Sequence, residues 1–215
     1  MIINNSQARR PRTISQARRP RTIKLIAVVI CFAAFTSCLK EDDATVLLPL
    51  PIGEIYGVDL PQGMLDHIGV NEGTTPPDVD GAYLASPLTL EYASDNYWND
   101  DYYDLYVAFT QVEGRLRTTY RESQSQTSGT APEARIIGSG NSFTVYFTSQ
   151  MRNDAEQWSC TTLTIISGRL TSQGIEDFQY CNAMLSKNDP LNKIMAVGDY
   201  HVFSTKGVPA VPYQW

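Results

Sequence analysis

The sequence has few of the residues from which catalytic and metal sites are built. It contains only two histidines, His67 and His201, which lie 134 positions apart. Its four cysteines form no Cys-x-x-Cys pair, and no His-x-Glu or His-Glu-x-x-His pattern occurs, so the common zinc-site spacings are missing. Residues 138–142 lack the Gly-x-Ser-x-Gly register of a nucleophile elbow and are typical of a tight turn. We therefore expect a protein that is not an enzyme and has no cofactor or dedicated metal site.

A long hydrophobic run is also missing. The longest one, residues 25–35, has eleven apolar residues, whereas a membrane-spanning helix needs about 20. Residues 1–24 hold seven Lys or Arg side chains and no acid. A basic start, a short apolar segment and then small residues indicate a secretory signal peptide over residues 1–37. The repeated SQARRPRTI at 6–14 and 15–23 lengthens this leader and is too short for a stacked repeat.

The expected leader ends in Phe-Thr-Ser-Cys at residues 35–38. This sequence resembles the lipobox of bacterial lipoproteins, with Phe35 in the place where Leu is usual. The resemblance implies cleavage before Cys38 and attachment of a diacylglyceryl group to its sulfur. Two or more acyl chains anchor a protein stably to a membrane, so the expected partner of Cys38 is membrane lipid.

A lysine and three acids follow the cysteine directly: Lys40, Glu41, Asp42 and Asp43. This run resembles the export signal that sends lipoproteins of Bacteroidota to the outer face of the outer membrane. The resemblance implies a lipid-anchored protein at the cell surface. The alternative is a solvated tether, because acidic runs are commonly solvating.

The mature chain is strongly acidic. The full chain has 17 basic and 23 acidic residues, and removal of residues 1–37 takes away seven basic and no acidic ones. What remains is 10 basic against 23 acidic residues, a formal charge of −13. Such a chain repels phosphate backbones, so nucleic acid is not an expected partner. Cations, neutral glycans and basic proteins remain compatible with it.

The rest of the chain divides into a tether and a β domain. Residues 38–78 are rich in Pro and Gly and predict a partly extended tether that lies against the domain, with a short amphipathic stretch at 64–68. Residues 79–215 show β-strand patterns separated by turn signals. Expected strands cover 83–92, 103–112, 115–121, 134–137, 142–150, 158–170, 175–187 and 194–204.

One of these segments, residues 175–187, fits two patterns. Ile175, Phe178, Cys181 and Leu185 lie near helical spacing, whereas Phe178, Tyr180, Asn182 and Met184 alternate as in a strand. If it is a strand, eight consecutive antiparallel strands predict an all-β meander, most simply an eight-stranded lipocalin-like β-barrel, with a β-sandwich as the competitor. Residues 73–83, 166–168 and 197–203 resemble parts of uncharacterised Bacteroidota lipoproteins with lipocalin-like domains.

Cys160 and Cys181 are the cysteines that remain if Cys31 leaves with the leader and Cys38 takes lipid. A pair in an oxidising compartment makes a disulfide a candidate. A hairpin that faced these residues would turn between Leu170 and Thr171, but the Ser-Gln-Gly turn signal lies later, at 172–174. Both arrangements stay open.

The most unusual mature stretch is residues 94–104, where aromatic residues alternate with carboxylates and amides. Aromatic rings pack on sugar rings while polar groups take the hydroxyls, so a glycan or small-molecule contact is one interpretation. Ca²⁺ held by Asp95, Asp100, Asp101 and Asp104 is a second, although no EF-hand spacing is present. A plain connecting loop is the third. The candidate ligand-binding residues are Tyr97, Trp98, Tyr102, Asp100 and Asp101.

Two functions are consistent with the sequence. In the first, the β domain binds a glycan or a small apolar molecule in its cavity or at the 95–104 loop. In the second, the chain is a structural or interaction subunit of an envelope complex. An open, apolar-lined barrel would favour the first, and a filled barrel with a broad apolar patch would favour the second.

We predict that Cys38→Ala leaves a soluble or mislocalised precursor, because the sulfur that carries the lipid is removed. Membrane fractionation of cells that express the variant measures this. Normal fractionation of Cys38→Ala with the membrane would contradict lipidation at this residue.

Overall fold

The fold is known from a computed structural model that describes residues 60–61, 63–97, 103–112, 115–123 and 128–215. The expected leader and several sequence-derived site residues lie outside this range and stay predictions. These residues are Cys38, Lys40, Glu41, Asp42, Asp43, Trp98, Asp100, Asp101 and Tyr102.

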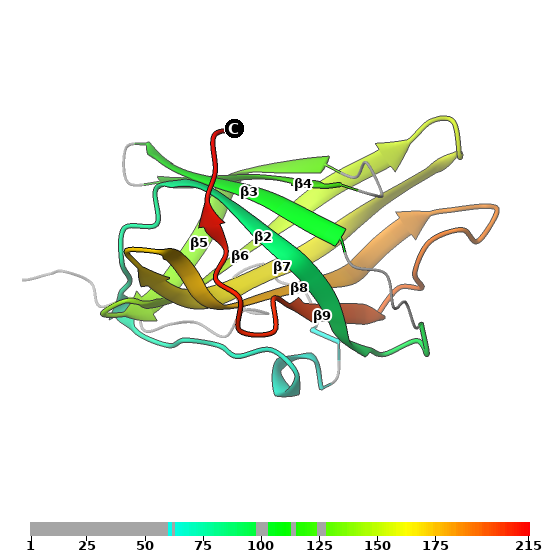
Figure 1. Ribbon diagram of the computed structural model, residues 1–215. Helices are drawn as coiled ribbons and strands as arrows, with labels where there is room; N and C mark the ends of the chain where they lie inside the picture. The colour runs from blue at the N-terminus through cyan, green and yellow to red at the C-terminus, as the bar shows by residue number, and fades with distance from the viewer. Residues whose placement is uncertain (1–59, 62, 98–102, 113–114, 124–127) are drawn as a thin grey trace, which may run out of the picture. The chain divides into compact units, whose positions relative to one another are not determined.

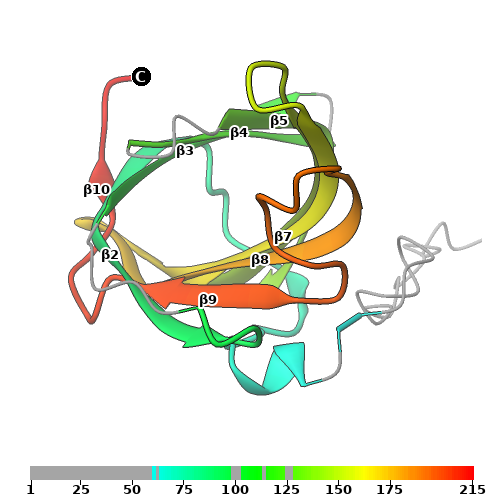
Figure 2. The ribbon, with the colours of Figure 1, turned by 90° about the vertical axis from the view of Figure 1, so that its right-hand side faces the viewer.

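Eight consecutive antiparallel strands form a closed hydrogen-bonded ring (Figures 1 and 2). Each strand pairs with the next one along the chain, and the last pairs with the first. The strands are β2 (Gly81–Ala93), β3 (Tyr103–Val112), β4 (Arg115–Glu122), β5 (Ser128–Ser139), β6 (Ser142–Asn153), β7 (Trp158–Thr171), β8 (Gly174–Asn188) and β9 (Tyr200–Ser204). Two short strands are added outside the ring: β1 (Thr74–Thr75) pairs parallel with β5, and β10 (Val211–Pro212) pairs with β2.

The order and number of these strands confirm the expected antiparallel meander. The ambiguous segment 175–187 is a strand, β8, and the expected hairpins at 113–114 and 138–141 join neighbouring strands. Register shifts interrupt the ladders between several strands, including one at Pro87 in β2. The ring is therefore too irregular to be called a barrel. A β-sandwich would consist of two facing sheets, whereas here the eight strands form one continuous hydrogen-bonded sheet.

Alternation of side chains gives the ring an apolar interior. Along β6, Phe143, Val145 and Phe147 are buried in the main core, and along β8 Phe178 and Tyr180 join them. The rings of Phe109 and Phe143 meet edge to face. Because successive residues of a strand point to opposite faces, the period-two pattern of the sequence becomes an apolar interior.

A second buried cluster lies on the other face of β6 to β9. Its strand residues include Leu163, Ile165 and Cys181, and the segment that precedes the ring covers them with Met64 and Ile68. This segment contains a short 3₁₀ helix, η1 (Met64–Asp66), within the amphipathic stretch expected at 64–68. Residues 60–61 and 63–75 therefore lie against the sheet.

Gly138 lies where β1, β5 and β6 meet. Its φ is +152°, and a Cβ built on it would lie 2.2 Å from the carbonyl oxygen of Ser142. Its amide also donates to the Gly73 carbonyl at 3.1 Å. Only glycine fits this backbone approach, whereas Gly140 in the following turn has φ +61° and open space around it.

We predict that Gly138→Ala lowers the free energy of unfolding by about 3 kcal/mol, because its backbone clash adds to an unfavourable φ. The matched control Gly140→Ala should cost only about 1 kcal/mol, since it has the left-handed φ without the clash. Urea denaturation of the purified variants measures both. Equal losses would contradict the close packing at Gly138.

Candidate functional site

One end of the ring is hollow. A cavity of about 600 Å³ lies there, at the end that faces the viewer in Figure 2. Its walls come from strands β2, β3, β4 and β6 to β9 and from the connections after β2, β6 and β8. The lining residues are Leu90, Tyr97, Tyr103, Glu122, Met151, Asn153, Glu156, Trp158, Cys160, Thr162, Asn182, Met184, Ile194, Met195, His201 and Phe203.

A hydrogen-bonded network lies beside the cavity. The hydroxyls of Tyr120 and Ser149 are 3.0 Å apart, and Ser149 lies 3.0 Å from the hydroxyl of Thr162. Tyr120 also donates to the sulfur of Met151 at 3.2 Å. Burial raises the pKa of Tyr120, so this side chain stays a neutral phenol. Paired hydroxyls can be buried at low cost, and this network fixes the side chains between the packed core and the cavity.

A carboxylate lies in the cavity wall among tyrosines. Tyr180 donates its hydroxyl to Glu122 Oε1 at 3.2 Å. Burial, together with the negative charge of Glu122, raises the pKa of Tyr180 and of Tyr103. Both phenols are therefore neutral, and Tyr180 faces the Glu122 side chain as a hydrogen-bond donor.

Tyr97, one of the sequence-derived candidates, lines the cavity and is 45% exposed. Its ring stacks on His201 with centroids 4.9 Å apart. Asp95 Oδ1 lies 2.9 Å from His201 Nε2 and accepts the Tyr97 amide at 3.0 Å. Burial acts to raise the pKa of Asp95, but the hydrogen bonds from His201 and from the Tyr97 amide have the larger effect. The pKa of Asp95 therefore lies below its ordinary value. Asp95 thus fixes both rings.

The Ca²⁺ interpretation of this stretch stays a prediction, because Asp100 and Asp101 lie outside the described residues. Asp95 is engaged by His201 and by the Tyr97 amide. Within the described part of the chain, no group of three or more His, Cys, Asp or Glu side chains could hold a metal ion.

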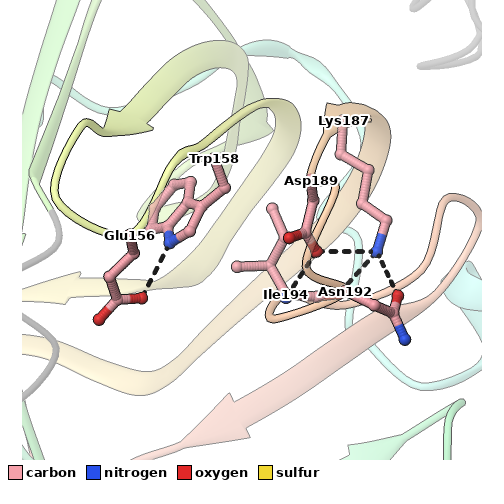
Figure 3. Close-up of polar contacts among 6 residues, drawn as sticks. All are labelled: Glu156, Trp158, Lys187, Asp189, Asn192 and Ile194. Carbon is pink, nitrogen blue, oxygen red and sulfur yellow. Dashed lines mark hydrogen bonds and ion pairs between the residues drawn. The ribbon is translucent and has the colours of Figure 1, made fainter.

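The connection between β8 and β9 is fixed by an ion pair (Figure 3). Lys187 Nζ lies 3.2 Å from Asp189 Oδ2 and also donates to Asn192 Oδ1 and to the Ile194 carbonyl, at 3.1 and 2.8 Å. Asp189 Oδ2 accepts the Ile194 amide at 2.9 Å. These bonds hold Ile194 and the following Met195, which line the cavity.

These hydrogen-bond donors stabilise the charged form of the Asp189 carboxylate. Its burial raises the pKa, but hydrogen bonds from the Ile194 and Lys193 amides and the charge of Lys187 outweigh this effect and lower the pKa. The stabilisation of the connection by this carboxylate is therefore fully present above about pH 4 and is lost as the pH falls through the lowered pKa.

Sequence reasoning missed several members of the site. Trp158 donates its indole N–H to Glu156 Oε2 at 3.1 Å (Figure 3), and both line the cavity together with Asn182 and Met184. The stretch 153–158 combines carboxylates, an amide and an aromatic, as 94–104 does, so the same compositional signal marks it. Asn182 and Met184 gave no such signal, because only ring closure decides which strand positions reach the hollow end.

The structure contains no disulfide between Cys160 and Cys181, both of which are buried free thiols. Cys160 lies opposite Lys187 and Cys181 lies opposite Ile165, about 17 Å apart along the strand at 3.4 Å per residue. They also lie on opposite faces, since Cys160 lines the cavity and Cys181 belongs to the outer cluster. The turn falls at 172–173, the later position that its residues indicated.

Comparisons of the chain with protein-family models, with curated proteins and with solved structures found no match. Across the described ranges, no helix has the length and apolar character needed to cross a lipid bilayer.

We predict that Lys187→Met speeds amide hydrogen exchange at Asn192 and Ile194 by about tenfold or more, because charge-assisted hydrogen bonds to the connection are lost. Exchange measured by NMR reports this. Lys193→Met is the matched control, since this exposed side chain lies in the same connection and should leave exchange at both amides unchanged. Equal exchange in both variants would contradict the role of Lys187.

Proposed function

We propose that the β domain binds a small ligand, a glycan or a small apolar molecule, in the cavity at the open end of the ring. The observation that carries this proposal is a cavity of about 600 Å³ with four aromatic side chains in its lining: Tyr97, Tyr103, Trp158 and Phe203. Ligand pockets are typically about 300–1,000 Å³, mainly apolar and aromatic, with a few polar groups. The size of this cavity and its four aromatic lining residues fit that description.

The fold supports the same function. We propose that the ring is a distorted form of the eight-stranded lipocalin-like barrel, because its strands follow one another as an up-and-down meander and the last strand pairs with the first. Rings of this size hold one small ligand when side chains do not fill them. One end of this ring is filled and the other is hollow. The hollow end favours ligand binding over the alternative of a structural subunit, for which a filled ring was expected.

The location follows from the N-terminal sequence. The basic leader, the lipobox-like residues 35–38 and the acids behind Cys38 support a protein anchored by lipid in the outer membrane and exposed at the cell surface. Such a protein would capture its ligand close to the membrane without catalysis.

We predict that Tyr97→Ala combined with Trp158→Ala weakens ligand binding at least about tenfold, since large aromatic contacts carry much of the affinity in such sites. Two neutral probe sets test this: fluorescence titration with N-phenyl-1-naphthylamine, and binding to an array of neutral glycans. We expect the unmodified protein to bind in one of the two assays.

Trp215→Ala is the matched control for this experiment. Trp215 is 58% exposed and does not line the cavity. The centroid of its ring lies 5.7 Å from the guanidinium carbon of Arg121. The control should bind as the unmodified protein does. Binding that survives the double substitution unchanged would show that the cavity is not the binding site.

A further inference from the structure

The cavity has an excess of negative charge. Two of its lining residues, Glu122 and Glu156, are carboxylates, and none of its described lining residues is Lys or Arg. His201 adds no net positive charge, because the Asp95 carboxylate lies 2.9 Å from its ring nitrogen.

Two polar side chains of the cavity, Glu122 and Glu156, are carboxylates, which accept hydrogen bonds and do not donate them when ionised. The indole N–H of Trp158, a donor, is already taken by Glu156. A ligand that donates hydrogen bonds would find acceptors in these carboxylates, whereas a ligand with only acceptors would not.

Aromatic rings complete this environment. Tyr97, Tyr103, Trp158 and Phe203 line the same cavity as the two carboxylates. The face of an aromatic ring attracts a cation, and the attraction strengthens where water is excluded. The same rings also pack against the apolar body of a ligand.

We propose that the ligand of this cavity is a protonated organic amine with an aromatic or apolar body. The ammonium group lies toward Glu122 and Glu156, while the body packs between the aromatic walls and Met184. This inference rests on the proposed ligand-binding function and narrows it. A neutral glycan fits less well, because it brings no positive charge to the two carboxylates.

Three matched probes test the charge preference on the full chain: tryptamine, tryptophol and indole-3-propionate. They share an indole and a two-carbon linker and end in an ammonium, a hydroxyl and a carboxylate. Isothermal titration calorimetry at low and high salt measures each affinity. We expect tryptamine to bind at least about tenfold more tightly than tryptophol, because a charge-assisted hydrogen bond replaces a neutral one. We expect added salt to weaken tryptamine alone.

Variants that remove the charge of one carboxylate test where the ammonium group of the ligand lies. Glu156→Gln keeps an acceptor for the Trp158 indole and lies in an exposed turn, so it tests charge without disturbing the fold. Together with Glu122→Gln it should lower tryptamine affinity about tenfold and leave tryptophol unchanged. Glu133→Gln is the control, because this carboxylate is 68% exposed, pairs with Arg115 and lies outside the cavity.

Several outcomes would overturn the inference. Equal affinity for tryptamine and tryptophol, tighter binding of indole-3-propionate, or no binding of any of the three excludes an amine preference. Tryptamine binding that is unchanged by both Glu→Gln variants does the same. None of these results bears on the broader proposal that the cavity binds a small ligand. The neutral probes and the variant with Tyr97→Ala and Trp158→Ala test that proposal separately.

Discussion

The pairing of β9 with β2 is the constraint on which the rest of the domain depends. Four residue pairs, from Thr89 with Ser204 to Ala93 with His201, join the last strand of the ring to the first. Once this ladder forms, each of the eight strands has a neighbour on both sides, and the sheet has an inside and an outside. Alternation along each strand then assigns every second side chain to the interior, where it must either fill the space or leave a cavity.

The interior of the ring differs between its two ends. Toward one end, large rings such as Phe109, Phe143 and Phe178 pack into a continuous core. Toward the other, smaller and polar side chains such as Cys160, Thr162 and Asn182 line open space. Two of the connections at that end are held in their described parts by specific bonds, Asp95 with His201 and Lys187 with Asp189. Fixed connections around a hollow end give the pre-organised geometry that a binding site needs.

The sequence predicted the fold well because local rules carry most of it. Period-two alternation and the short turns at 113–114 and 138–141 define the hairpins, and hairpins pair neighbours in the chain. Residues 175–187 could not be assigned in isolation, because their apolar residues satisfy two periods. The sequence left the pairing of Cys160 with Cys181 open, because it depends on register, which the turn at 172–173 and the bulges of β7 and β8 set. Of the sequence-derived ligand-binding residues, Tyr97 lies in the described part of the chain and lines the cavity.

By itself, the sequence determined the β class, the succession of strands, the acidic character of the mature chain and the expected lipid anchor at Cys38. Each of these follows from composition or from patterns within a few residues. Only the tertiary structure decided which side chains share the cavity. Glu122, Trp158, Asn182 and His201 lie on different strands, and they meet because ring closure brings positions far apart in the chain to the same end. Such long-range proximity depends on register and closure, which no local pattern encodes.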